Sequence, residues 1–496
     1  MSRLNATMLS NLPEEIDGPK YAPAEHGVGI LHIGIGAFHR GHQAVFTDDA
    51  IARAGGDWRI TGVSLRSPTV ANQLNPQNGL YTVTEKSGGK STSRVIASVA
   101  KVISARQNQS ELLTSLASPS IKIITLTVTE KGYYFDQATG TLMWEAEDVQ
   151  HDVLYPNQPV TMPGYLVLAC QLRMKSEYSH TSKLTVISCD NLSENGRITE
   201  KVVIALATKI SIELVEWISA NVTFCSSMVD RIVPKVTQTD IENHIASAGY
   251  EDRGLIITEP FKQWVIEDNF CTERPDWESV GVLFVDKVAD YEKLKIRTLN
   301  GSHSALAYMG VLLGYRYIHE AIGSDLLSNI VHQMMKDESG PTIPKFEGFN
   351  LAAYQQEIIA RFSNSDIAYE TQQVASDGSQ KLQQRILAPL NELYTQGNSK
   401  PNSVLLATLV SWLRYIKKAN EPEGFYDVVD PLATELTSIV DKYWESPSEL
   451  ILAIYESTSL IPRQLKLNKQ FNDDFHCALH AIDEHGVETY LKQLTY

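Results

Sequence analysis

Three polar side chains in the segment YEKLKIRTLNGSHSALAY (291–308) have the types and spacing that alcohol oxidation requires. On an α-helix advancing about 100° per residue, Lys295, Asn300 and His303 fall within an arc of about 140°, so all three can face one cleft. A lysine that is desolvated there has a lowered pKa, and its neutral amine can accept a hydroxyl proton. An amide donor can stabilise the alkoxide, and an imidazole can bind an adjacent hydroxyl group. The alternatives are a solvated lysine and a simple cap or turn at Asn300-Gly301, and spacing alone does not decide between these readings.

A pair of glycines follows an apolar run near the N-terminus. Residues 29–36 (GILHIGIG) predict a buried parallel strand that ends in Gly34 and Gly36. Because glycine has no Cβ, the backbone there can turn tightly and bring its amides to a pyrophosphate. His39 replaces the third glycine of the G-x-G-x-x-G pattern, so the motif alone fits both a nucleotide site and an ordinary strand–helix turn. The predicted cofactor contacts in this segment are Ile33, Gly34, Ile35, Gly36, Ala37 and Phe38.

The end of the second predicted strand bears on the choice of cofactor. A strand at 58–66 (WRITGVSLR) is followed by Ser67 and Pro68, without the acidic residue that usually binds the adenosine ribose. Arg66 could attract the 2′-phosphate of NADP, or it could be a solvated arginine at a strand end. These residues therefore leave NAD and NADP both open.

The pattern of the remaining chain indicates two domains. Apolar β-rich segments alternate with helical patterns over roughly the first 285 residues, which predicts a doubly wound parallel sheet. These segments are 121–128, 184–188, 221–225 and 254–258. After Asp290 the apolar residues recur at three- and four-residue spacing, which predicts an all-helical region. We expect an α/β Rossmann-type domain at 1–288, an all-α substrate and catalytic domain at 289–496, and an active-site cleft between them.

Composition excludes several classes of protein. The 496 residues are 43% hydrophobic and 21% charged, which is typical of a globular chain and not of a disordered or coiled-coil one. The net charge of −16 disfavours nucleic acid and anionic membranes as partners. No secretory signal and no run of about 18 apolar residues occurs, so we expect a cytoplasmic protein, and a chain of this size is compatible with a monomer. Five widely spaced cysteines predict reduced thiols.

Five motifs, in family order, carry a resemblance that spans essentially the whole chain. They are GIGAFHRGHQA (34–44), SCDNLSENG (188–196), MVDRIVP (228–234), EPFKQWVIEDNF (259–270) and KIRTLNGSHS (295–304). Together they resemble the long-chain polyol dehydrogenase family, which includes mannitol 2-dehydrogenases and uronate reductases. The resemblance implies that the N-terminal half binds a nicotinamide dinucleotide, that the helical half closes the substrate site, and that no metal takes part.

The resemblance also implies roles for individual residues. Lys295 would be the general base, Asn191 and Asn300 would hold the oxyanion, and His303 would bind a neighbouring substrate hydroxyl. This agrees with the chemistry read from the residue types.

Two acidic residues would complete the implied site. Asp230 would lie beside this cluster and contact cofactor and substrate, and Glu292, one helical turn before Lys295, would relay the proton to water. The family likeness favours NAD(H) over NADP(H).

Within the family, two segments resemble the fructuronate reductase branch, which interconverts D-fructuronate and D-mannonate. They are TVTEKGY (127–133) and DGSQKLQQR (377–385). Mannitol enzymes typically have an arginine where this chain has Gln373, and an apolar residue where it has Arg385. The branch's usual proline is replaced by Gln383, so the match is imperfect.

A uronate differs from a ketohexose by one carboxylate, which requires a nearby cation in a chain of net charge −16. Lys381 and Arg385 are four residues apart, so on a helix they share one face and could bind that carboxylate; a solvated basic face is the alternative. The alternative functions are a mannitol 2-dehydrogenase, another polyol or uronate dehydrogenase and, from a different class, an inactive dinucleotide-binding sugar sensor.

Overall fold

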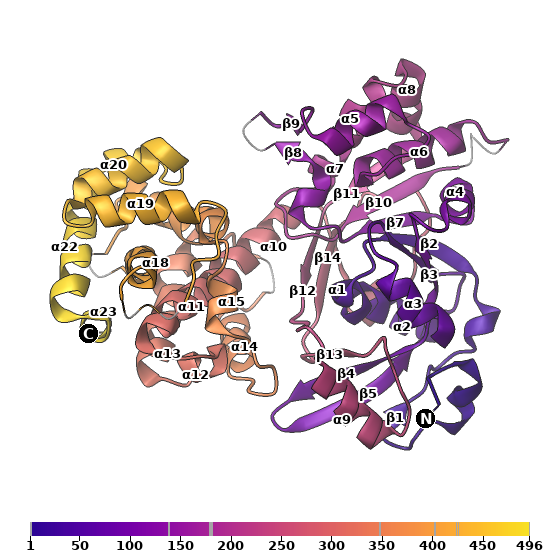
Figure 1. The fold of residues 1–496 in the computed structure, drawn as a ribbon, viewed down its shortest axis with the longest axis horizontal. Coiled ribbons are helices and arrows are strands. Elements are labelled where there is room, and N and C mark those ends of the chain that lie inside the picture. Colours follow the sequence, from indigo (N-terminus) through magenta and orange to yellow (C-terminus); the bar gives the residue numbers. More distant parts are fainter. Residues whose placement is uncertain are drawn as a thin grey trace. The chain divides into compact units, whose positions relative to one another are not determined.

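The computed structural model describes residues 2–136, 139–177, 182–346, 349–400, 403–422, 424 and 426–495. The chain divides into two compact units, residues 1–289 and 290–496, which we call the α/β unit and the helical unit (Figure 1). The predicted fold class, a doubly wound Rossmann-type domain followed by an all-α domain, is confirmed by the elements of each unit.

The central sheet of the α/β unit has six parallel strands in the order β11-β10-β7-β2-β3-β6 (Figure 1). Their bounds are β2 (Val28–Ile33), β3 (Arg59–Ser64), β6 (Val99–Ser104), β7 (Ile123–Leu126), β10 (Leu184–Ser188) and β11 (Val222–Cys225). Counted along the chain from β2, this is the 3-2-1-4-5-6 order of dinucleotide-binding folds. The order reverses between β2 and β7, so a ligand crevice is expected where the carboxyl ends of these two strands lie.

Helices cover both faces of this sheet because successive strand residues point to opposite sides. In β2, Ile30 belongs to the apolar cluster that includes Val45 and Phe46 of α2. Its neighbour Leu31 belongs to the cluster that includes Val167 of α6. The helices of this unit are α1 (Ala37–Gly41), α2 (Gln43–Ala54), α3 (Thr69–Leu74), α4 (Gln109–Ala117), α5 (Glu147–Leu154), α6 (Met162–Met174), α7 (Asn195–Thr208), α8 (Ile212–Asn221) and α9 (Gln238–Ala248).

Smaller sheets complete the α/β unit. A four-stranded mixed sheet has the order β1 (Ile16–Asp17), β5 (Lys90–Ile96), β4 (Tyr81–Ser87) and β13 (Ile256–Thr258). A three-stranded sheet has the order β12 (Ser227–Asp230), β14 (Gln263–Glu267) and β15 (Leu283–Val285), and β8 (Phe135–Asp136) pairs with β9 (Thr141–Leu142). The strand predicted at 254–258 therefore exists as β13, but it pairs with β4 instead of extending the six-stranded sheet. An apolar run predicts that a strand is buried on both faces, but it does not indicate which strand pairs with it.

The helical unit is built around α11 (Gly301–Leu313) and α18 (Val404–Ala419). From Gly301 to Leu312 every residue of α11 is buried, including the polar Ser302, His303 and Ser304 of its first turn. The other helices are α10 (Val288–Lys295), α12 (Ile318–Ile322), α13 (Asp325–Gln333), α14 (Leu351–Phe362), α15 (Thr371–Ala375), α16 (Gly378–Leu382), α17 (Ala388–Thr395), α19 (Ala433–Tyr443), α20 (Pro447–Thr458), α21 (Arg463–Leu467), α22 (Lys469–His485) and α23 (Val487–Leu494).

In the described part of this unit, three short π-helical turns interrupt the helices, at Ile296–Asn300, Met334–Ser339 and Gln383–Leu387. Such turns are rare and frequently occur at functional sites. Across the described ranges, no helix combines the length and the apolar character needed to cross a membrane.

Candidate active site

The glycine turn after β2 lies at the point where the strand order reverses. Gly34 has φ +98°, and a Cβ on it would lie 2.0 Å from the carbonyl oxygen of Thr127, so only glycine fits there. Gly36 precedes α1, and the nearest atom to a Cβ built on it is 3.7 Å away. The first glycine thus allows close approach to the loop after β7, and the second leaves an open stretch of backbone. This arrangement fits the pyrophosphate of a dinucleotide.

The remaining predicted cofactor contacts surround this turn. Ile33 ends β2 and, like Ile35, is buried, whereas Ala37 and Phe38 begin α1 and are half-buried.

His39 explains how the fold accommodates the missing third glycine. Its ring is fully buried and stacks on His32 of β2, with ring centroids 3.4 Å apart. His32 is hydrogen-bonded to the hydroxyls of Thr125 and Thr127. Burial lowers the pKa of His32 to about 3 and lowers the pKa of His39 well below its ordinary value, so both rings are neutral near pH 7. The stacked imidazoles fill the space between α1 and β2 that a third glycine would leave empty.

Two other predicted residues occupy the surface of the α/β unit. Asn191 is exposed on the loop between β10 and α7. Arg66 is exposed two residues after the end of β3, close to the hydroxyl of Tyr134.

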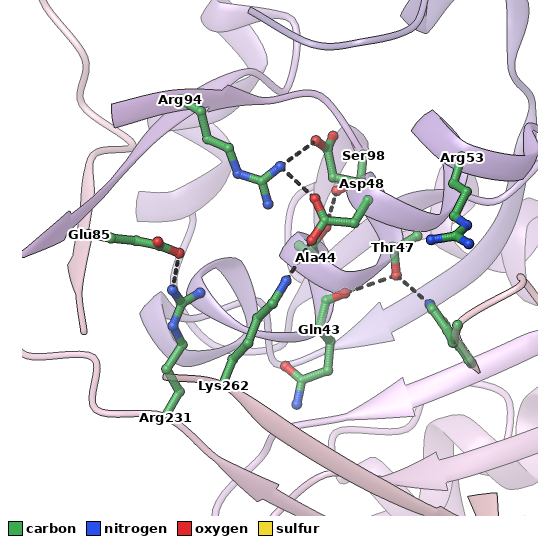
Figure 2. Close-up of polar contacts among 12 residues, drawn as sticks. Gln43, Ala44, Thr47, Asp48, Arg53, Glu85, Arg94, Ser98, Arg231 and Lys262 are labelled. Atoms are coloured by element: carbon green, nitrogen blue, oxygen red, sulfur yellow. Dashed lines mark hydrogen bonds and ion pairs between the residues drawn. The ribbon is translucent and has the colours of Figure 1, made fainter. Parts of the chain in front are cut away.

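Asp230 is the last residue of β12, is 4% exposed, and is followed by a buried arginine. Arg231 donates hydrogen bonds to the carbonyl oxygens of Gly41 (2.6 Å) and Glu259 (2.8 and 3.0 Å), and it forms an ion pair with Glu85 (Figure 2). These bonds fix the backbone that follows Asp230 to α1 and to the loop after β13.

A second set of charges lies over α2 in the same view. Asp49 accepts from Arg94 at 2.6 Å and from Lys262 at 2.5 Å, and Lys262 lies over the ring of Phe46. Figure 2 labels the side chains of Arg94 and Lys262. Lys262 belongs to the EPFKQW motif, so these contacts attach that motif to α2.

In the helical unit, a π turn brings the predicted catalytic trio closer together than an α-helix would. Lys295 ends α10, the π turn covers Ile296–Asn300, and α11 follows. A π turn advances by about 85° per residue in place of about 100°, so the arc spanned by Lys295, Asn300 and His303 narrows from about 140° to about 65°. The predicted continuous α-helix is therefore wrong in this segment.

The trio is largely enclosed. Lys295 is 6% exposed and His303 8% exposed, and Asn300 is half-buried. The His303 ring packs on Phe362 and Tyr369, with centroids 4.3 and 5.8 Å away. Glu292, one helical turn before Lys295, is 8% exposed.

An ion pair anchors the other side of the π turn. Arg297 donates to Glu392 at 2.5 and 2.7 Å and to the carbonyl oxygen of Thr342 at 3.0 Å. The Arg297 guanidinium holds the pKa of Glu392 below its usual range.

A second π turn, Gln383–Leu387, packs against the first. A Cβ on Gly301 would lie 3.3 Å from the carbonyl oxygen of Arg385. The Nη1 atom of Arg385 lies 3.4 Å from the carbonyl oxygen of Asn300 and 3.3 Å from the hydroxyl of Ser304. Arg385 therefore lies beside the predicted alkoxide-binding residue.

Lys381 contacts a different part of the unit. Its Nζ donates to the carbonyl oxygens of Ser376 (2.6 Å) and Val374 (3.4 Å) and to the Ser376 hydroxyl (3.3 Å), at the end of α15. α16 continues directly into the π turn that carries Arg385, and the Lys381 and Arg385 side chains contact different groups.

Comparison with known proteins decides the family. The model of the mannitol dehydrogenase Rossmann domain matches residues 28–279, and the model of the mannitol dehydrogenase C-terminal domain matches residues 287–483. The chain belongs to the mannitol dehydrogenase family. It is thus a member of an oxidoreductase family of polyol and sugar dehydrogenases, and the resemblance inferred from the sequence is confirmed.

Relatives within the mannitol dehydrogenase family cover nearly the whole chain. The uncharacterised oxidoreductase YeiQ of Escherichia coli is 38% identical over 98% of this chain and 99% of its own length. The D-mannonate oxidoreductase of the same organism is 36% identical over 96% of this chain and 97% of its own. A solved structure of Pseudomonas fluorescens mannitol 2-dehydrogenase, a ternary complex with NAD and D-mannitol, has a TM-score of 0.86 at 34% identity and covers 99% of both chains.

Sequence reasoning missed several neighbours of the predicted residues in this mannitol dehydrogenase family member. Phe362 and Tyr369 pack on His303, and Ser304 contacts Arg385. Phe362 ends a segment that was predicted to be helical, but apolar spacing does not reveal which helix a side chain meets. Within the described ranges, no group of three or more His, Cys, Asp or Glu side chains is placed to hold a metal ion.

Proposed function

We propose that this chain transfers a hydride between NAD(H) and a secondary alcohol or ketone of a sugar acid, with D-mannonate and D-fructuronate as the substrate pair. The observation that carries this choice is the guanidinium of Arg385, 3.4 Å from the carbonyl oxygen of Asn300. A cation at this position, in a chain of net charge −16, supplies what a substrate carboxylate needs. The 36% identity to a D-mannonate oxidoreductase supports the same choice.

NAD is the proposed cofactor, held at the glycine turn in the α/β unit. Support comes from the open backbone at Gly36, the strand order of the sheet, and a related mannitol 2-dehydrogenase that was solved with NAD. When bound, NAD accepts the hydride from the substrate carbon. In this proposal residues 1–288 bind the dinucleotide, and residues 289–496 supply the general base and the substrate contacts.

The proposed mechanism assigns one task to each polar group. Lys295, largely removed from water, accepts the hydroxyl proton. Asn191 and Asn300 donate hydrogen bonds to the oxygen as it becomes negative, and His303 binds the neighbouring hydroxyl group. Proton transfer and charge stabilisation are then both supplied by side chains, so the proposed reaction is metal-independent.

Two acidic residues have supporting tasks in this proposal. Glu292, one helical turn before Lys295, relays the proton onward to water. Asp230, at the end of β12, contacts cofactor and substrate.

Arg385 is proposed to bind the C1 carboxylate of the uronate. An arginine can hold a carboxylate with two parallel hydrogen bonds. Lys381 was predicted to share this task; because its ammonium contacts the end of α15, we assign it the supporting part and Arg385 the main one.

Replacing Arg385 by leucine is expected to weaken fructuronate reduction far more than fructose reduction. Losing one desolvated charge pair costs about 2 to 5 kcal/mol, and fructose has no carboxylate to lose. The measurement is kcat/KM for both ketoses in wild type and variant, with Lys381→Leu, which removes the supporting contact and should lose less on fructuronate, as the comparison. Equal losses on both substrates would make Arg385 a structural residue.

Cofactor preference gives a separate prediction. We expect kcat/KM with NADH to exceed that with NADPH, although Arg66 follows β3 where an acidic residue is usual. The Arg66→Ala variant should leave the NADH value nearly unchanged, because NAD carries no 2′-phosphate. A preference for NADPH that disappears in this variant would contradict the NAD assignment and identify Arg66 as its cause.

A mannitol 2-dehydrogenase is the second candidate, favoured by the similarity to the Pseudomonas fluorescens enzyme. An inactive sugar sensor is the third. Mixing the protein with NADH and fructuronate separates the sensor from an enzyme. The proposal expects NADH absorbance to fall with wild type and to stay nearly constant with Lys295→Ala, whereas a sensor would leave it constant with both.

We further propose that the enzyme acts as a monomer.

A further inference from the structure

Asp190 connects two loops at the carboxyl end of the six-stranded sheet, immediately before Asn191. Its Oδ2 accepts hydrogen bonds from the backbone N–H of Val128 (2.9 Å) and from the hydroxyl of Tyr133 (2.7 Å). Its Oδ1 accepts from the backbone N–H of Thr129 at 2.9 Å. All three donors belong to residues 127–133, the loop that follows β7. One carboxylate therefore joins that loop to the loop that carries Asn191.

The loop that Asp190 holds has a strained backbone. Thr129 has φ +66° and ψ 162°, a conformation that a β-branched residue rarely adopts. The N–H groups of Thr129 and of the residue before it are the two backbone donors to Asp190. The same loop begins at Thr127, whose carbonyl oxygen lies against Gly34. Asp190 thus stabilises the conformation of a loop that borders the glycine turn.

A second residue fixes the backbone on the same side of Asn191. The Nδ2 of Asn195 donates to the carbonyl oxygens of Asp190 and Ser227, each at 2.8 Å. Its Oδ1 accepts from the N–H of Ser227 at 3.0 Å. Asp190 is therefore held through both its side chain and its main chain, so the exposed Asn191 side chain extends from a fixed backbone.

The groups around the Asp190 carboxylate make it a hydrogen-bond acceptor and not a binding site for a cation. Its three donors are neutral groups. Burial raises the pKa of Asp190 above its ordinary value, while Tyr133 and the two amides oppose that shift, and Glu130 adds to it. Burial also raises the pKa of Tyr133 well above its ordinary value, so the phenol keeps the proton that it donates.

We infer that Asp190 is a positioning residue, which sets Asn191 for hydride transfer and is itself held by its bonds to Val128, Thr129 and Tyr133. The inference rests on the proposed role of Asn191 as an alkoxide donor. Asp190 touches neither substrate nor cofactor in this account, and it acts through Asn191.

A double-mutant cycle between Asp190 and Asn191 tests this inference. In Asp190→Asn an amide N–H replaces one acceptor oxygen and faces a backbone N–H. We expect kcat to fall by about tenfold or more, up to the about 10²- to 10³-fold loss expected for Asn191→Ala, with KM for fructuronate changed much less. The double variant should be no slower than Asn191→Ala alone. Once the Asn191 amide has been removed, displacing residue 191 costs no further hydrogen bond to the substrate oxygen.

Tyr133→Phe provides a milder version of the same cycle if Asp190→Asn does not fold. It removes one of the three donors and keeps both amide bonds, so a smaller fall in kcat is expected, again absent in the Asn191→Ala background. NADH binding, followed by fluorescence, should stay close to wild type in both variants.

The outcomes distinguish the positioning role of Asp190 from the alkoxide-donor role of Asn191. If the losses multiply in the double variants, or if Asp190→Asn and Tyr133→Phe keep wild-type kcat, the positioning role is wrong while the role of Asn191 stands. If Asn191→Ala itself keeps wild-type kcat, both fail together.

Discussion

Replacing Lys295 by alanine is expected to lower turnover by about 10²- to 10⁴-fold while leaving NADH binding intact, the loss that follows removal of a general base. Lys295 is 6% exposed and ends α10 beside the π turn that carries Asn300. Bulk water therefore does not readily replace its amine as the proton acceptor in the variant. The measurement is kcat for mannonate oxidation and fructuronate reduction, with the dissociation constant of NADH determined separately.

Lys293 offers a matched control on the same helix. It is half-buried and lies 3.5 Å from Glu392, so Lys293→Ala removes an ammonium without removing the proposed base and should keep turnover within a few-fold of wild type. The base must be neutral for oxidation and protonated for reduction. Oxidation should therefore rise, and reduction fall, as pH increases through its pKa. Turnover within a few-fold of wild type in Lys295→Ala, or the opposite pH trends, would reject the assignment.

Alanine at Asn191 or at Asn300 is expected to lower kcat by about 10²- to 10³-fold each, with a smaller change in KM. Each amide is proposed to donate to an oxygen that becomes fully negative only as the reaction proceeds, so its loss raises the barrier more than it weakens substrate binding. Steady-state kinetics on both variants gives the two constants. The exposed Asn398, which contacts Gln396 in the helical unit, is the control position, and its alanine variant should keep wild-type constants.

A change in KM alone would show that these asparagines bind the ground state, and would remove them from the proposed oxyanion site. Arg385 contacts the backbone carbonyl oxygen of Asn300, which alanine retains, so neither variant removes that contact.

Much of the fold could be predicted because local patterns determine it. The buried run 184–188 is β10 residue for residue, and the run predicted at 29–36 overlaps β2, which covers Val28–Ile33. Gly34 could be singled out because a tight turn after a central strand requires a residue without Cβ. The strand at 99–104 was not predicted: Lys101 interrupts its apolar run, and β6 lies at the edge of the sheet, where continuous apolar sequence is not required.

The geometry of the candidate site could not be read from spacing. The π turn at Ile296–Asn300 packs against a second π turn at Gln383–Leu387, and nothing in either segment alone marks it. Four-residue spacing also did not reveal that Lys381 contacts the end of α15 while Arg385 contacts Asn300 and Ser304. His39 looked like a defect in a glycine motif, and its stacking on His32 depends on a contact between two elements.

The most direct test of the proposed function is a comparison of kcat/KM for fructuronate, tagaturonate and fructose, each with NADH and with NADPH, together with the reverse reaction on mannonate and mannitol. The account predicts the highest reductive kcat/KM for fructuronate with NADH, and oxidation of mannonate in preference to mannitol. A higher kcat/KM for fructose would contradict it in favour of a mannitol 2-dehydrogenase, and no oxidation or reduction of any of these compounds would contradict the assignment of an enzyme.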